Sequence, residues 1–129
     1  MFVTLRNHHF GKQLSGTNDK RACLSNNEQN WEIWLMEKVE GHKYAFKSFH
    51  GTYLTSNNNG EAGLQPHCKA WEHFEVVPIG EGLFFIESHH GSFLRGNNDG
   101  NKVDFAKKSK KWELWEIRKT EGNREWFRL

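Results

Sequence analysis

The sequence lacks the features that would place the protein outside the cell or in a membrane. It has only two cysteines, Cys23 and Cys68, at different positions in the pattern described below, so we expect free thiols rather than a disulfide. No run approaches about 18 consecutive apolar residues, and the N-terminus MFVTLRNHH has no apolar secretion-signal core. Phe2 stands where N-myristoylation requires glycine. These absences predict a cytoplasmic protein without a transmembrane segment.

Catalytic motifs and a strong net charge are also missing. The chain has no P-loop, no nucleophile elbow, no CxxC pair and no HExxH motif, so we expect no enzymatic activity and no cofactor. Its 18 basic and 16 acidic side chains leave a net charge of +2, which is too small to demand a nucleic-acid partner. Electrostatic recognition must therefore come from a local cluster.

The eight histidines include two adjacent pairs, His8–His9 and His89–His90. Consecutive residues of a strand point to opposite faces, so such a pair is poorly placed to chelate one metal ion. Three histidines recur at one position of the repeat described below, His9, His50 and His90, and we expect them to be turn residues that hydrogen-bond to nearby backbone. A metal site and pH-sensitive binding are the alternatives.

The sequence does contain an internal repeat of about 40 residues. Each unit has a glycine at the same place, at Gly11, Gly51 and Gly91. Each unit also carries a Trp-Glu-x-Phe/Trp signature, which begins at Trp31, Trp71 and Trp112. The repeats span about 2–39, 40–79 and 80–119.

Alternating apolar and polar residues predict four short strands in each repeat, because a period of two is typical of half-buried strands. In the second repeat we expect them at about 43–49, 52–56, 62–66 and 71–77. Three units of four strands predict an all-β, single-domain β-trefoil over residues 1–129. One apolar residue from each strand is expected in the core: Leu5, Phe46, Ile86, Leu14, Leu54, Leu94, Leu24, Leu64, Phe105, Trp34, Phe74 and Trp115.

Two further expectations concern the first residue of the signature and the turns. Trp31, Trp71 and Trp112 occupy equivalent positions and are expected to be part of the buried scaffold. Asparagines follow the second-strand leucine by four residues in every repeat, where a turn is expected to need a positive φ; they are Asn18, Asn58 and Asn98.

The tail, residues 120–129, resembles the first strand of a fourth repeat. Because a bare apolar edge is a liability in solvent, we expect the tail to lie beside residues 2–6 as a thirteenth strand. The alternative is that residues 124–129 pair with a second copy of the chain in a homodimer.

The segments HGTYLTS (50–56) and HGSFLRG (90–96), with the Trp-Glu-x-Phe/Trp signature, resemble the fascin-like β-trefoil family, which includes fascin and hisactophilin. The resemblance covers about residues 2–119. It implies an intracellular, cytoskeletal protein that binds actin filaments. Members of the hisactophilin type also bind anionic membranes, so an anionic lipid surface is a second implied partner.

The repeats differ most in the loop between their third and fourth strands, and divergent loops are where function is best sought. Only the third repeat has four positive charges there: Lys107, Lys108, Lys110 and Lys111. These lysines are candidates for docking onto an acidic surface, such as actin, phosphoinositide or nucleic acid, with Lys102 and Arg118 as candidate neighbours. A solvated loop without a partner is the alternative.

A carbohydrate-binding, lectin-like module is the second functional hypothesis. Its candidate residues lie in the asparagine-rich turns: Asn57, Asn58, Asn59, Asn97, Asn98 and Asp99. The Q-x-W signature of ricin-type lectins is absent from the sequence. A protein-interaction adaptor that uses neither ligand is the third hypothesis.

Overall fold

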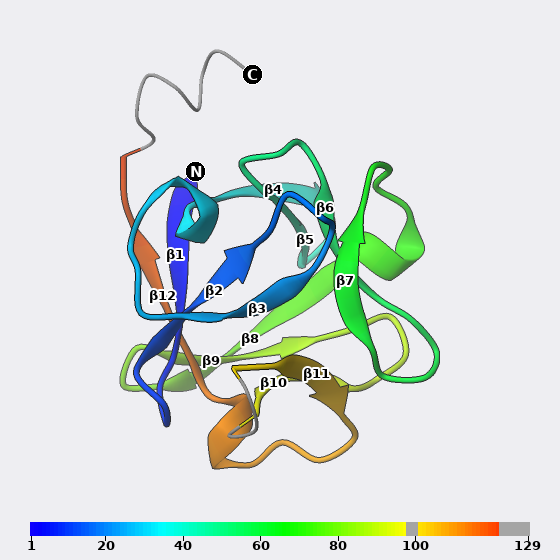
Figure 1. Ribbon diagram of the computed structural model, residues 1–129. Coiled ribbons are helices and arrows are strands. Elements are labelled where there is room, and N and C mark those ends of the chain that lie inside the picture. Colours follow the sequence, from blue (N-terminus) through cyan, green and yellow to red (C-terminus); the bar gives the residue numbers. More distant parts are fainter. Residues whose placement is uncertain (98–100, 122–129) are drawn as a thin grey trace.

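The computed structural model describes residues 1–97 and 101–121, which form twelve strands and three short 3-10 helices (Figure 1). The first repeat contains β1 (Phe2–Asn7), β2 (Lys12–Gly16), β3 (Ala22–Ser25), η1 (Asn30–Glu32) and β4 (Trp34–Glu40). The second contains β5 (Lys43–Lys47), β6 (Tyr53–Ser56), β7 (Ala62–Gln65), η2 (Ala70–Glu72) and β8 (Phe74–Gly80). The third contains β9 (Leu83–Glu87), β10 (Phe93–Gly96), β11 (Val103–Ala106), η3 (Lys111–Glu113) and β12 (Trp115–Lys119).

The first and fourth strands of the repeats close a six-stranded antiparallel barrel. Its cyclic order is β1, β4, β5, β8, β9 and β12, with β12 pairing back to β1. The second and third strands form three hairpins, β2–β3, β6–β7 and β10–β11. A closed barrel with three hairpins in pseudo-three-fold arrangement is a β-trefoil, so the predicted fold class is confirmed.

The predicted core is also confirmed, since all twelve expected residues are buried in one cluster. The two core tryptophans keep their indole N–H groups satisfied: Trp34 Nε1 donates to the Leu14 carbonyl at 2.9 Å, and Trp115 Nε1 donates to the Leu94 carbonyl at 2.8 Å. Phe74 takes the same place in the second repeat and has no polar atom to satisfy. The repeats therefore differ in side chain while keeping one packing scheme.

Backbone hydrogen bonds between repeats link the three hairpins. The backbone N–H of each third-strand core residue donates to a carbonyl in the turn of a neighbouring hairpin: Leu24 to Asn101, Leu64 to Lys20 and Phe105 to Gly60. Lys20, Gly60 and Asn101 have positive φ. The prediction that Asn18 and Asn58 take this conformation was wrong, because the left-handed residue lies two positions later in both turns. Asn98 lies outside the described residues.

The strand expected at 71–77 begins later than predicted. The Trp-Glu-x segments form η1, η2 and η3, and the fourth strands start at the aromatic residue that follows. The prediction that the first tryptophan is buried was wrong for Trp31 and Trp71, whose exposed fractions are 38% and 41%. Trp112 is half-buried. A tight turn rotates these rings out of the alternating strand pattern and places them at the surface.

Near the C-terminus, the Thr120 N–H donates to the Phe2 carbonyl at 2.8 Å and extends the β1–β12 ladder by one bond. The predicted thirteenth strand and the homodimer contact through residues 124–129 fall on 122–129, outside the described residues. Cys23 and Cys68 are free thiols, as expected. Among residues 1–97 and 101–121, no helix is long and apolar enough to cross a bilayer.

Candidate functional site

The loop between β11 and β12 carries the predicted lysines, and we call residues 107–111 the basic loop. All four lysine side chains are exposed. They have no ion-pair partner among the residues that the structure describes. Lys111 is the first residue of η3, so the charged segment runs directly into the turn that precedes β12 (Figure 1). Four ammonium groups without such a partner make the basic loop a cationic surface.

The equivalent loops of the other repeats share the scaffold but not the charge. Residues 25–30 contain one acidic side chain and no lysine, and residues 65–70 contain one lysine. Each of the three loops ends in a 3-10 turn at the same structural position. The cationic surface is therefore a specialisation of the third repeat and not a requirement of the fold.

The two candidate neighbours of the basic loop have other surroundings. Arg118 Nη2 pairs with Glu116 Oε1 at 2.7 Å, on β12. Lys102 lines a separate pocket together with Arg21 and Cys23. Neither residue is a member of the pocket that adjoins the basic loop, which is described below.

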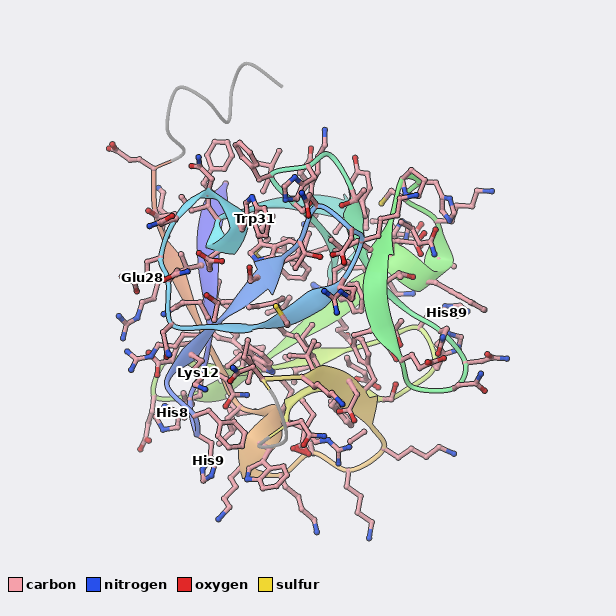
Figure 2. All side chains as sticks on the ribbon, in the orientation of Figure 1. His8, His9, Lys12, Glu28, Trp31 and His89 are labelled. Atoms are coloured by element: carbon pink, nitrogen blue, oxygen red, sulfur yellow. The ribbon has the colours of Figure 1, made fainter. Side chains whose placement is uncertain are left out.

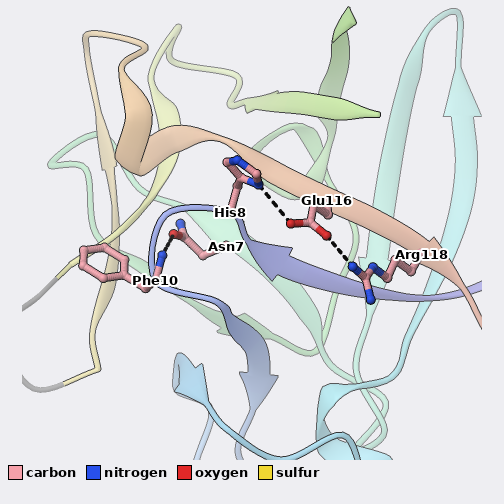
Figure 3. Close-up of polar contacts among 5 residues, drawn as sticks. All are labelled: Asn7, His8, Phe10, Glu116 and Arg118. Atoms are coloured by element: carbon pink, nitrogen blue, oxygen red, sulfur yellow. Dashed lines mark hydrogen bonds and ion pairs between the residues drawn. The ribbon is translucent and has the colours of Figure 1, made fainter. Parts of the chain in front are cut away.

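His8 shares the carboxylate of Glu116 with Arg118 (Figure 3). His8 Nδ1 lies 3.0 Å from Glu116 Oε2. The hydrogen bond with His8 is the largest cause of the lowered pKa of Glu116, and the hydrogen bond from Arg118 lowers this pKa further. His9 instead packs against Phe10, with ring centroids 4.7 Å apart. Figure 2 shows the two histidines at the β1–β2 turn. Adjacent residues thus have different partners, and no group of three potential metal ligands gathers within residues 1–97 and 101–121.

The exposed tryptophans contact repeated histidines across the boundaries between repeats. Trp31 meets His50 edge-on with centroids 4.9 Å apart, and Trp71 meets His90 in the same way at 5.0 Å. The ring of His90 also hydrogen-bonds through Nε2 to the Ser56 carbonyl at 3.0 Å, as expected of a turn residue bonded to backbone. The same expectation was wrong for His50, whose Nε2 is buried without a hydrogen-bond partner among the described residues. These contacts join one repeat to the next.

The glutamate of the Trp-Glu-x-Phe/Trp signature is buried in all three repeats, a feature that sequence reasoning missed. In the first repeat, Ser15 Oγ donates to Glu32 Oε2, and the Gln29 N–H donates to Oε1 at 3.0 Å. In the second, Thr55 Oγ1 donates to Glu72 Oε2, and the Lys69 N–H donates to Oε1 at 2.8 Å. Each carboxylate therefore has one hydroxyl and one backbone donor.

The third repeat breaks this arrangement at Glu113. Arg95 stands where the other repeats have Ser15 and Thr55, and its guanidinium makes two hydrogen bonds to Asp104, at 2.9 and 2.7 Å. Glu113 is only 3% exposed, and its Oε2 has no hydrogen-bond partner among residues 1–97 and 101–121. Burial raises the pKa of Glu113, against the attraction of Arg95 and the backbone N–H of Lys110.

A pocket of about 270 Å³ opens at this place, next to the basic loop. It is lined by Arg95, Lys110, Lys111, Trp112 and Glu113. The ring of Trp112 is supported from the first repeat by Phe10, with centroids 5.4 Å apart. The signal that could have found this pocket is the residue after the second-strand leucine, which is Ser, Thr and then Arg in the three repeats.

The asparagine-rich turns are only partly described. Asn57 uses its own side chain to hold its turn: Oδ1 accepts from the Asn59 and Glu61 N–H groups, both at 2.9 Å, and Nδ2 donates to Glu61 Oε1 at 2.9 Å. Residues 57–59 line a pocket of about 240 Å³ with His90 and Lys107. The Asn97 N–H donates to the Lys102 carbonyl at 2.9 Å. Asn98 and Asp99 lie outside the described residues.

The chain matches the family model of the FRG1-like domain over residues 14–126. No curated protein matches the chain.

Solved structures are similar to the whole chain. SeviL bound to asialo-GM1 saccharide has a TM-score of 0.82 at 14% identity, over 93% of this chain and 98% of that one. The designed three-fold symmetric protein ThreeFoil has a TM-score of 0.78 at 19% identity, over 92% and 99%. The BEL beta-trefoil has a TM-score of 0.78 at 18% identity, over 91% of both chains. At these identities the likeness establishes the β-trefoil fold.

Proposed function

The chain belongs to the FRG1-like domain family, and we propose that it is a non-enzymatic, cytoplasmic binding module whose basic loop docks onto the acidic surface of an actin filament. The observation that carries this proposal is the set of four exposed lysines without an ion-pair partner among the described residues. The fascin-like sequence motifs point to the same partner. A large share of the attraction is electrostatic, so binding weakens as salt is added.

The geometry suits binding through one face. The basic loop is short, and its 3-10 turn and the following strand anchor its backbone to the barrel. The corresponding loops of the other repeats lack this charge, and one chain therefore offers one such site. Bundling of filaments requires two sites, which a homodimer through residues 124–129 would supply.

The test is cosedimentation with actin filaments at low and at raised salt. The variant Lys107→Glu, Lys108→Glu, Lys110→Glu, Lys111→Glu is expected to lose binding. The matched control reverses the charge of four exposed lysines outside the basic loop: Lys20→Glu, Lys38→Glu, Lys43→Glu and Lys69→Glu. Both variants have the same net charge, so retained binding in the control alone identifies the loop as the contact.

Failure of the parent chain to pellet with filaments at low salt contradicts the proposal. Equal loss in both variants attributes any attraction to overall charge and also contradicts a site at the basic loop. Flotation with vesicles that contain anionic lipid, carried out with the same variants, distinguishes a membrane surface from a filament. Lipid binding without filament binding would reassign the partner.

Saccharide binding at the asparagine-rich turns is the second candidate. The pocket of about 240 Å³ that contains Asn58, Asn59, His90 and Lys107 favours it. A glycan array with the parent chain and an Asn58→Ala, Asn59→Ala variant tests it. Glycan binding that the variant lacks, together with no pelleting with filaments, would place this function first.

A further inference from the structure

The pocket under the third 3-10 turn contains an unfilled hydrogen-bond position. In the first two repeats the buried signature glutamate accepts from the hydroxyl of Ser15 or Thr55. In the third repeat Arg95 replaces that hydroxyl, and Glu113 Oε2 is left buried without a partner in the part of the chain that the structure describes. Leaving a buried acceptor unsatisfied is costly, so such a group calls for an explanation.

Arg95 attracts Glu113 electrostatically, but its hydrogen bonds go to Asp104 and do not replace the missing hydroxyl bond. Its Nε and Nη2 atoms bond to the two carboxylate oxygens of Asp104 across the β10–β11 pair, where Arg95 and Asp104 are opposite each other. The same pair in the second repeat is Thr55 opposite Gly63. The third repeat has thus exchanged a hydroxyl and a glycine for an ion pair, and the exchange leaves the buried Glu113 Oε2 without an internal donor among the described residues.

The walls of the pocket define what such a ligand must contain. Glu113 Oε2 accepts a hydrogen bond and so selects a hydroxyl, which would take the place of the missing Ser or Thr side chain. Lys110 and Lys111 supply two exposed positive charges at the rim, and Trp112 supplies an aromatic surface. The volume of about 270 Å³ suits one small ring rather than a large ligand.

We infer that this pocket binds a hydroxylated ring with one anionic group, of the kind found in a uronic acid or a sugar phosphate. A ring hydroxyl donates to Glu113, and the ring packs against Trp112. The anionic group pairs with Lys110 and Lys111. This site differs from the asparagine-rich turns and does not rest on filament binding. An acidic sugar residue and a phosphorylated sugar share this chemistry, and the two probes below separate them.

The test is a titration of the ¹⁵N-labelled protein at pH 7 with D-glucuronic acid and with glucose 6-phosphate, observed at the Trp112 indole N–H, which a Trp112→Phe variant assigns. A ligand of this size is expected to bind with a Kd on the order of 1 mM. D-glucose, which has the hydroxyls but no charge, is expected to bind at least about tenfold more weakly. The tighter of the two anionic probes identifies the anion.

The decisive variant is Arg95→Thr with Asp104→Gly, which copies the second repeat and supplies Glu113 with an internal hydroxyl. It keeps the net charge and all four loop lysines, and it is expected to weaken probe binding by at least about tenfold because the acceptor is already occupied. The matched control makes the same substitutions at an exposed ion pair of the first repeat, Arg21→Thr with Asp19→Gly, and is expected to bind unchanged.

Several results would overturn the inference. The first is that neither anionic probe shifts the Trp112 signal at concentrations up to about 50 mM, far above the expected Kd. The second is that D-glucose binds as tightly as the anionic probes. The third is that the Arg95→Thr, Asp104→Gly variant binds the probes as the parent chain does. That variant is expected to pellet with actin filaments as the parent chain does. Failure of filament binding and failure of this pocket are therefore separate observations.

Discussion

The buried signature glutamates allow a stability prediction in which the same substitution has opposite effects in two repeats. Glu72→Gln and Glu113→Gln each replace a buried carboxylate by a neutral amide of nearly the same shape. Glu72 has two donors, the Thr55 hydroxyl and the Lys69 N–H. Glu113 Oε2 has no hydrogen-bond donor among the described residues.

The magnitudes follow from these partners. Hydrogen bonds to a charged group contribute about 1.5–3 kcal/mol each and those between neutral groups about 0.5–1.5, so Glu72→Gln should lower the free energy of unfolding by roughly 2 kcal/mol. Glu113→Gln exchanges an unpartnered buried charge, which costs more than about 3 kcal/mol, for an unpartnered neutral amide, which costs about 1–3, and it weakens one backbone bond by about 1. It should therefore raise that free energy by up to about 1 kcal/mol at pH 7. The two melting temperatures should then differ by about 10 °C.

The gain from Glu113→Gln should depend on pH. Burial raises the pKa of Glu113 above its ordinary value of 4.5. Between that value and the raised one, the folded state binds more protons than the unfolded state, so the stability of the parent chain falls as pH rises. The carboxylate is protonated in both states below about pH 4, where the advantage of the variant should disappear.

Urea denaturation of the parent and both variants at pH 7 and at pH 4, followed by circular dichroism, measures these differences. A Glu113→Gln variant that loses as much stability at pH 7 as Glu72→Gln would refute the reasoning. It would show that Glu113 Oε2 is satisfied within the protein, and the argument for a ligand hydroxyl would lose its basis.

Three further predictions concern the scaffold. Glu116→Gln should lower stability by about 0.5–1 kcal/mol at pH 7 and by little at pH 3. The pKa of Glu116 is lowered in the folded protein, so its carboxylate stabilises the fold above its ordinary pKa, and this stabilisation is lost as pH falls. Thermal melts at both pH values measure this. In urea titrations, Gly60→Ala should lower the free energy of unfolding by roughly 3 kcal/mol and Gly91→Ala by only about 1. Both glycines have positive φ. A Cβ at Gly60 would lie 2.8 Å from a backbone oxygen, whereas a Cβ at Gly91 would meet open space. Phe74→Ala should cost about 3–5 kcal/mol by the same assay, whereas Trp71→Ala, at a ring 41% exposed, should cost under about 1.

The fold was predictable from the sequence because each strand position is repeated three times. Leu14, Leu54 and Leu94 fill one equivalent place in the core, and the period of two around them indicates which side chains face inward. The rings of Trp31 and Trp71 escaped this logic. A single 3-10 turn before the strand changes the direction of the side chain, and no hydrophobic pattern records such a turn.

The candidate site was predictable only in part. The basic loop is visible as a run of lysines that the other repeats lack. The pocket beside it depends on Arg95 being drawn to Asp104 and on Glu113 being buried, which are facts of packing between strands that are not adjacent in the sequence. A residue-by-residue comparison of the repeats points to Arg95, but only the structure shows what its presence leaves unsatisfied.

The central claim is that binding is a property of the third repeat and not of the whole trefoil. Hydrogen–deuterium exchange of the chain with and without actin filaments tests it directly. The account predicts slowed exchange at residues 107–113 and unchanged exchange in the equivalent loops, 25–30 and 65–70. Equal protection of all three loops, or none at residues 107–113 while filaments are bound, would contradict it.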